Sequence, residues 1–280
     1  MKNKCKFSLT WKLITLTTLV PFLASGQDNN PLKDYMSGIP SHPSSSKEMK
    51  YRMTAIYTNR DLYGNFTGKT KITGDYTTGL GKGYAKWNNV YLSASDKFEE
   101  PFDLGKKLAY IENFTYVPSS KMLEPSYFEG FPNSPEAVLA KNMVWDMFTF
   151  EKLGLNYGDS LKLNRIYKIR PGDGKFNMAD IGNYTHKEIQ LCWTGISYLN
   201  DQLCYLVEFR AIDNMIELTL PGLNTRGTEQ YWGTVWIASG TGLIEHAEMY
   251  SGTIQEIEIK GMQDKILAKT VRDLQLYRIQ

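Results

Sequence analysis

Cysteine and histidine are scarce in this sequence, which has only three of each among 280 residues. The usual zinc spacings, H-E-x-x-H and paired C-x-x-C, do not occur. The G-x-S-x-G motif, which carries the nucleophile of many hydrolases, is also missing. We therefore expect no metal and no cofactor, and we favour a non-catalytic protein while leaving enzyme activity open.

A basic excess is also missing once the N-terminal segment is set aside. The formal net charge of the whole chain is +2, but four of its lysines lie within the first twelve residues and no acid accompanies them. Removal of these lysines changes the formal net charge to −2. A chain without a basic excess does not favour binding to a polyanion, so we expect no nucleic acid partner.

The N-terminal residues have the pattern of a secretory signal peptide. The four lysines are followed by the apolar run "LITLTTLVPFL" and by the small residues Ala24 and Gly26 before Gln27. This pattern predicts a signal peptide over residues 1–26 and export to the periplasm or the extracellular space. Gln27 stands where a lipoprotein signal has cysteine, so we expect no lipid anchor. No later apolar run is long enough to cross a bilayer, so we expect no transmembrane segment after signal cleavage.

After the signal, the pattern divides the chain into a leader and one domain. Residues 27–47 are rich in Asn, Pro and Ser and lack apolar periodicity, which predicts a flexible leader. From residue 48 to residue 280, apolar and polar residues mostly alternate, which predicts a single β-rich domain. The stretches 107–117, 160–169, 202–212 and 215–220 are each predicted to be a strand. Short connections between strands favour antiparallel neighbours.

One helix is predicted, over residues 135–153. Ser134 is a good N-cap, Pro135 suits the first helical position, and Gly154 is expected to stop the helix. Apolar side chains cover most of its circumference, which predicts burial nearly all round. Asn142, Asp146 and Thr149 form a narrow polar stripe along this helix. We expect this stripe to reach solvent or to bind backbone groups, and a catalytic role for its aspartate remains open.

These elements together predict the fold class. The fold is mainly β (α+β), with an antiparallel curved sheet or half-barrel of about ten or more strands packed around one long buried helix.

Cys192 and Cys204 flank a predicted turn and are the cysteines that remain after signal cleavage. Matching the apolar faces of the two flanking strands requires a loop longer than a two-residue turn at residues 200–201. In one register the two cysteines face each other and a disulfide is feasible. In another register Glu188 faces Arg210 and the sulfurs are too far apart. A disulfide and two separate thiols therefore both remain open.

The stretch "YWGTVWIASGTGLIEHAEMY" is predicted to be a hairpin that places Val235 opposite His246. In this register His246 and Glu248 share one face of the hairpin, and Trp232 and Trp236 share the other. A neighbouring histidine and glutamate could start an acid/base site, although such a histidine is also often structural. The catalytic candidates are His246, Glu248, Glu188 and Asp146.

The hairpin stretch "GTVWIASGTGLIEHAEMY", together with a buried helix between runs of antiparallel strands, resembles the periplasmic lipoprotein-carrier-like proteins. In that family a curved open sheet wraps a helical plug, and the resemblance implies a groove for acyl chains. The chain departs from the family in its long leader and its larger number of strands. The ligand-facing candidates are Trp145, Phe148, Trp232 and Trp236.

Three functional hypotheses follow. The first is an exported, non-catalytic protein that binds an apolar small molecule or an envelope protein through a curved, aromatic-rich sheet. The second is a secreted or periplasmic hydrolase that acts on glycans or peptides through carboxylate and histidine side chains. The third is a subunit of a surface complex, which an exposed apolar patch would indicate.

Overall fold

A computed structural model of the chain describes residues 48–170 and 174–279. The signal peptide and the leader, predicted for residues 1–26 and 27–47, lie outside the described residues. Within the described part, thirteen strands form one sheet. The strands are β1 (Met49–Asp61), β2 (Phe66–Leu80), β3 (Tyr84–Ser95), β4 (Lys106–Lys107), β5 (Phe114–Tyr116), β6 (Ile166–Ile169), β7 (Lys175–Asn177), β8 (Gly182–Thr185), β9 (Ile189–Leu199), β10 (Gln202–Leu220), β11 (Leu223–Ala238), β12 (Ile244–Ile259) and β13 (Ile266–Ile279).

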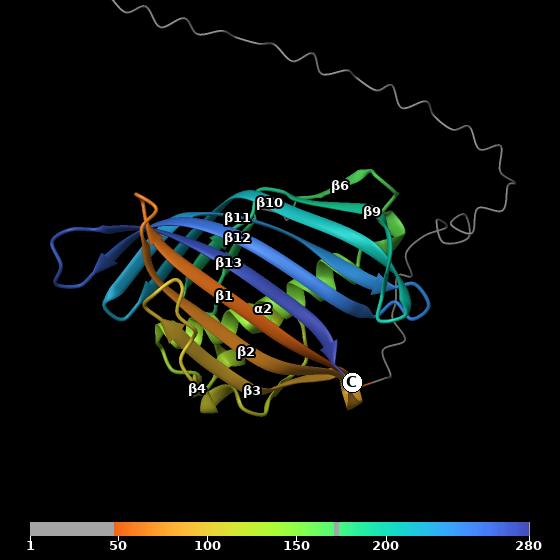
Figure 1. Cartoon of the computed structure of the whole chain (residues 1–280), viewed down its shortest axis with the longest axis horizontal. Coiled ribbons are helices and arrows are strands. Elements are labelled where there is room, and N and C mark those ends of the chain that lie inside the picture. The colour runs from red at the N-terminus through yellow and green to blue at the C-terminus, as the bar shows by residue number, and fades with distance from the viewer. Residues whose placement is uncertain (1–47, 171–173, 280) are drawn as a thin grey trace, which may run out of the picture.

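The sheet is antiparallel and open. Its main order is β4-β3-β2-β1-β13-β12-β11-β10-β8-β7, with β5 beside β3, β9 beside β10 and β6 beside β9. The first and last long strands, β1 and β13, are neighbours at the centre of the sheet. Figure 1 shows this sheet curving over one long helix, α2 (Pro135–Leu155). The predicted fold class is therefore confirmed.

Short 3₁₀-helices occupy parts of the connections. They lie at Gly81–Gly83, Ala109–Ile111, Ser120–Leu123, Pro125–Phe128 and Gly158–Ser160. Two of them, Ser120–Leu123 and Pro125–Phe128, lie in the stretch that precedes α2 and bury Met122 and Phe128.

The start of α2 is as predicted, but its end is not. The Ser134 hydroxyl accepts a hydrogen bond from the Ala137 N–H, which satisfies one of the free donors of the first turn. The helix ends at Leu155, because Gly154 is not the stop but lies inside the last turn. A Cβ atom at this glycine would lie 2.9 Å from Cγ1 of Val235 on β11. The absence of a side chain at Gly154 therefore allows the helix to pack closely against β11.

The concave face of the sheet and α2 enclose one large hydrophobic core. Helical residues of this core include Met143, Met147 and Phe150, each 1% exposed or less. Phe150 packs edge-on against Phe209 of β10, with ring centroids 6.1 Å apart. The near-complete burial that the apolar pattern of the helix predicts is explained by a sheet that curves around it.

Four predicted strands differ in extent. The stretch 107–117 is divided into the end of β4, a 3₁₀-helix and β5, and Asn113, just before β5, adopts a positive φ of 61°. The stretches 202–212 and 215–220 form one strand, β10, with an irregularity at Asp213, whose φ is 58°. Of the stretch 160–169, only β6 is a strand.

Both registers considered for the β9–β10 hairpin are wrong. The strands are joined by a two-residue turn at Asn200 and Asp201, whose φ values are 50° and 57°. The sequence predicts a longer loop, because a turn this short would place the apolar faces of the two strands on opposite sides. Leu206 pairs with Gly195 and Val207 pairs with Trp193, so one extra residue on β9 forms a bulge. The bulge restores the match, because it shifts the pairing by one residue within the strand.

This register separates the two cysteines. Cys192 lies opposite Glu208, and Cys204 lies opposite Ser197. Both thiols are free in the structure. Burial raises the pKa of both, and that of Cys204 reaches about 11, so neither thiol is activated as a nucleophile.

The register predicted for the β11–β12 hairpin is wrong by one residue. Val235 lies opposite Ala247, and His246 lies opposite Trp236. The pairing shifts between Trp236 and Ile237, where Glu245 is the extra residue of a bulge. As a result the histidine and the tryptophan, which were predicted to lie on different faces, share the outer face of the sheet.

Candidate functional site

A cavity of about 540 Å³ lies between α2 and the concave face of the sheet. Its walls come from α2, from the 3₁₀-helix Ser120–Leu123, and from strands β1, β2, β7, β8 and β10 to β13. Apolar and aromatic side chains provide most of the lining: Tyr57, Met122, Leu123, Val138, Leu139, Trp145, Phe148, Phe176, Met178, Tyr184, Ile216, Leu218, Leu220, Leu223, Tyr231, Met249 and Ile257. Cavities of about 300–1,000 Å³ with such linings are typical of small-molecule sites.

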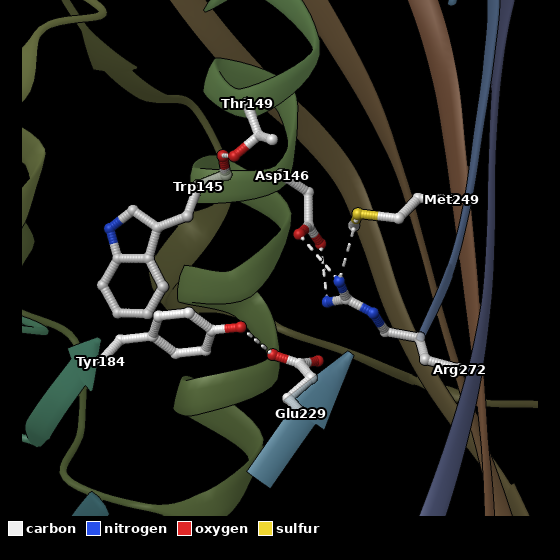
Figure 2. Close-up of polar contacts among 7 residues, drawn as sticks. All are labelled: Trp145, Asp146, Thr149, Tyr184, Glu229, Met249 and Arg272. Carbon is white, nitrogen blue, oxygen red and sulfur yellow. Dashed lines mark hydrogen bonds and ion pairs between the residues drawn. The ribbon is translucent and has the colours of Figure 1, made fainter. Parts of the chain in front are cut away.

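A buried ion pair stands at one wall of the cavity, as Figure 2 shows. Two nitrogens of the Arg272 guanidinium, on β13, donate to the two oxygens of Asp146, on α2, at 3.1 and 3.2 Å. Both side chains are 10% exposed. Burial raises the pKa of Asp146 to about 6, while the adjacent guanidinium opposes this shift. Because both of its oxygens are bound, the carboxylate is not free to act as a general base.

The guanidinium has further neighbours. It lies 5.8 Å from the ring centroid of Tyr57 on β1, and one of its nitrogens points to the sulfur of Met249 at 3.7 Å. Its Nε is buried without a hydrogen-bond partner among the described residues. Burial raises the pKa of Tyr57, and Arg272 partly opposes the shift. This wall of the cavity is therefore fixed by charge and ring contacts rather than by solvent.

A second carboxylate, Glu229 of β11, lies on the same side of the helix (Figure 2). It accepts a hydrogen bond from the Tyr184 hydroxyl of β8 at 2.6 Å. Burial and the neighbouring carboxylate together raise the pKa of this tyrosine well above its usual range. The tyrosine therefore remains a neutral donor, and the carboxylate keeps a fixed orientation.

Tyr184, the donor to this carboxylate, belongs to a cluster of aromatic rings. The ring of His186 lies 4.7 Å from that of Tyr184, 5.6 Å from that of Phe176 and 5.8 Å from that of Tyr231, measured between centroids. All four side chains line the cavity. The Nδ1 atom of His186 is 3.0 Å from the side-chain oxygen of Asn214. Burial lowers the pKa of this histidine, so it is neutral at neutral pH.

The polar stripe of the helix was expected to reach solvent or to bind backbone groups, and it faces the cavity instead of the outer solvent. Asn142, Asp146 and Thr149 all line the cavity. The alternative that the stripe binds backbone groups holds for Thr149, whose hydroxyl donates to the Trp145 carbonyl oxygen at 2.9 Å. The indole N–H of Trp145 in turn donates to the carbonyl oxygen of Met122 at 3.0 Å. These bonds fix one wall of the cavity.

The ligand-facing candidates fall on two sides of the sheet. Trp145 and Phe148 line the cavity. Trp232 and Trp236 do not line it, because residues of β11 at odd positions, such as Tyr231, point inward and those at even positions point outward. On the outer face Trp232 stacks on Tyr250 and is 47% exposed.

The catalytic candidates do not converge. Asp146 is in the cavity, whereas His246 lies on the outer face between the rings of Trp236 and Tyr277, at centroid distances of 4.7 and 4.5 Å. Its Nδ1 is 2.6 Å from the carbonyl oxygen of Leu276, which fits a structural histidine.

The two glutamates among these candidates also lie away from the cavity. Glu248 shares the outer face with His246 and accepts a hydrogen bond from Tyr250. Glu188 binds Lys168 and Arg170 at 3.1 and 3.2 Å, and its hydrogen bonds and these cations lower its pKa to about 2. Neither glutamate lines the cavity.

Sequence reasoning missed Arg272, Glu229, Tyr184 and Tyr57. A signal for the arginine does exist, because alternation in β13 puts it on the same face as Leu274 and Leu276, both fully buried. A charge on an apolar face needs a buried partner. The partner itself could not be identified, because pairing with a helix more than a hundred residues away depends on the tertiary fold.

The described residues contain no group of three or more histidine, cysteine, aspartate or glutamate side chains that could hold a metal ion. In the same part of the chain, no helix has the length and apolar character needed to cross a membrane. A second hollow, of about 460 Å³, lies at the β10–β11 and β12–β13 turns, is lined largely by polar and charged residues from 258 to 265, and contains none of the predicted site residues.

Comparison with known proteins does not place the chain in a family. No family model and no curated protein matches the sequence. A lipovitellin structure, solved to describe lipid–protein interactions, is similar with a TM-score of 0.47 and 14% sequence identity. The match covers 86% of this chain and 25% of the lipovitellin chain, so this chain spans about a quarter of that protein. A DUF1329 family protein from Desulfovibrio piger matches with a TM-score of 0.16 and 9% identity, over 83% of this chain and 87% of that one.

Proposed function

We propose that this protein is a non-catalytic binding protein whose ligand has a long apolar body, such as an acyl chain. The observation that carries the proposal is the cavity of about 540 Å³ between α2 and the concave face of the sheet. Burial of apolar ligand surface contributes roughly 25 cal/mol per Å², so a mainly apolar lining favours an apolar ligand.

The edges of the cavity support entry from solvent. Ile216, Leu218 and Ile257, on the inner face of β10 and β12, are only half-buried although they line the cavity. These residues lie in the last five positions of β10 and the last three of β12, next to the turns that end these strands. An apolar chain can therefore enter along the concave face without displacing the helix.

The protein is further proposed to act after export, in the periplasm or outside the cell, without a lipid anchor. The signal-like segment before Gln27 supports this part of the proposal. Mass spectrometry of the exported protein tests it: we expect a chain that begins at Gln27 and carries no acyl group. A chain that retains the segment, or that carries acyl groups, contradicts it.

A matched pair of variants tests the binding function. Thr225 of β11 is buried and lines the cavity, whereas Thr228 of the same strand is exposed on the outer face. We expect the purified protein to bind a fluorescent acyl probe and Thr225→Trp, which fills the cavity, to lose binding by more than tenfold. Thr228→Trp should bind as the wild type does. Equal binding by both variants would place the ligand elsewhere.

The positions of the catalytic candidates do not favour a hydrolase. Asp146 is held by Arg272 inside the cavity, and the sheet separates it from His246 on the outer face. A nucleophile and its general base must lie within hydrogen-bond distance of each other and close to the reacting atom. Asp146 and His246 do not meet this condition.

A further inference from the structure

We propose that the cavity selects amphiphiles whose polar head is a cation, such as an alkyl ammonium or alkyl trimethylammonium group. This inference rests on the proposed binding of apolar chains and names the head group that accompanies the chain. It follows from the charges and the aromatic rings that line the cavity.

The charges of the lining do not balance. Among the described residues of the lining, Asp146 and Glu229 are acidic, Arg272 is basic, and burial keeps His186 neutral. The arginine already binds both oxygens of Asp146. No ion pair forms at Glu229 within the described part of the chain, and its carboxylate instead accepts the Tyr184 hydroxyl. Glu229 therefore has no hydrogen-bonded cation among residues 48–170 and 174–279, and it interacts with Arg272 only through space, in a mainly apolar cavity where charge interactions are stronger than in water.

Aromatic rings lie next to this unpaired charge. The Tyr184 hydroxyl donates to the Glu229 carboxylate, the Tyr184 ring contacts that of His186, and His186 in turn contacts Phe176 and Tyr231. Aromatic faces attract cations, and groups of such rings bind quaternary ammonium ions. A cationic head would thus contact both a carboxylate and several rings, while its chain would extend along the apolar lining.

An anionic head fits the same cavity poorly. A carboxylate or phosphate would approach two carboxylates, and both terminal nitrogens of Arg272 already bind Asp146, which leaves only the buried Nε of this guanidinium without a partner among the described residues. Like charges in a low-dielectric site repel strongly. We therefore expect discrimination by head charge among ligands with the same chain.

Four probes separate chain from head: dodecyltrimethylammonium and dodecanoate below their micelle concentrations, dodecanol below its solubility limit, and tetramethylammonium. Isothermal titration of the purified protein should give the tightest binding for dodecyltrimethylammonium, weaker binding for dodecanol, and binding of dodecanoate weaker than that of the cation by about tenfold or more. Tetramethylammonium alone should bind far more weakly than its dodecyl form, because it lacks the chain.

A charge-removing variant tests the assigned carboxylate. Glu229→Gln keeps the shape and can still accept the Tyr184 hydroxyl, so we expect it to fold and to lose most of the preference for the cation. Glu208→Gln removes an exposed carboxylate of β10 and should keep the wild-type preference.

The outcomes distinguish the two proposals. Binding of dodecanoate as tight as that of dodecyltrimethylammonium, or a Glu229→Gln variant with unchanged preference, overturns the cationic head while apolar-chain binding stands. Equal affinity for tetramethylammonium and its dodecyl form indicates a site for the free cation and also overturns the amphiphile. Failure of every dodecyl probe to bind overturns both proposals.

Discussion

Asp146 and Arg272 are 126 positions apart in the sequence, yet two hydrogen bonds join their side chains inside the protein. The aspartate belongs to the only α-helix of the described residues, and the arginine belongs to a strand at the centre of the sheet. The pair thus links α2 to β13 at the wall of the cavity (Figure 2). Several consequences of this arrangement can be measured.

Removal of the arginine should be strongly destabilising. Arg272→Met leaves the buried Asp146 without a cation, and breaking a buried ion pair in this way costs about 3–5 kcal/mol. We expect a loss of this size in urea unfolding at pH 8. The loss should be smaller at pH 5, where the carboxylate can be protonated at lower cost.

The double variant Asp146→Leu/Arg272→Met is the control for this experiment. Replacing both charged groups by apolar ones leaves no unpaired charge, so it should recover most of the lost stability. A single variant as stable as the wild type would show that the pair does not link helix and sheet.

Glu151, near the end of α2, should make stability depend on pH. It accepts a hydrogen bond from Tyr76 at 3.1 Å, and burial raises its pKa from 4.5 to about 7. The folded protein thus binds an additional proton between pH 4.5 and about 7, and stability should fall as the pH rises through this range. Glu151→Gln removes this dependence.

The size of this effect can be bounded. A full shift corresponds to about 3 kcal/mol, but Glu151 is half-buried rather than fully enclosed, so we expect about 1–2 kcal/mol. Urea unfolding should show Glu151→Gln to be more stable than the wild type by this amount at pH 8 and equal to it at pH 4. Parallel curves for the two proteins across this range would contradict the raised pKa.

Gly154 should not tolerate a side chain, although alanine is a better helix former by about 1 kcal/mol. Its added methyl group would lie 2.9 Å from Cγ1 of Val235. We expect a net loss of about 1–2 kcal/mol for Gly154→Ala, because the clash outweighs the gain in helix propensity. In a Val235→Ala background the same substitution should be neutral or stabilising. A loss of equal size in both backgrounds would exclude this contact as the cause.

The cysteines should remain reduced after export. The register places Cys192 opposite Glu208 and Cys204 opposite Ser197, so a disulfide would require the two strands to slide past each other. Alkylation in denaturant without a reducing agent should modify both thiols, as measured by intact mass. Protection of both from alkylation would indicate a disulfide and a different register.

The elements of this fold could be predicted where the cause is local. Alternation of apolar and polar residues gave the strands, and Ser134 with Pro135 gave the start of the helix. The predicted pairing registers were wrong in both hairpins because each hairpin contains a bulge. The extra residue is Glu245 in β12 and Thr194 in β9. One extra residue reverses the faces on its far side, and no local pattern marks it.

The candidate site was predictable only in part, because its residues come together through the tertiary fold. Trp145 and Phe148 were identified because a helix that is apolar all round must be enclosed. Asp146 was noticed as polar on that helix, but its partner Arg272 lies on the last strand, and Glu229 lies on a third element. Their proximity depends on how far the sheet curves, which is a property of the whole fold.

The central claim is that the ligand occupies the space between α2 and the concave face of the sheet. Photocrosslinking with an alkyl diazirine probe, followed by peptide mapping, tests this most directly. We expect labels on cavity residues such as Trp145, Phe148 and Ile216, and competition by an unlabelled alkyl chain. Labels confined to the outer face, around Trp232 and Tyr250, would contradict the claim.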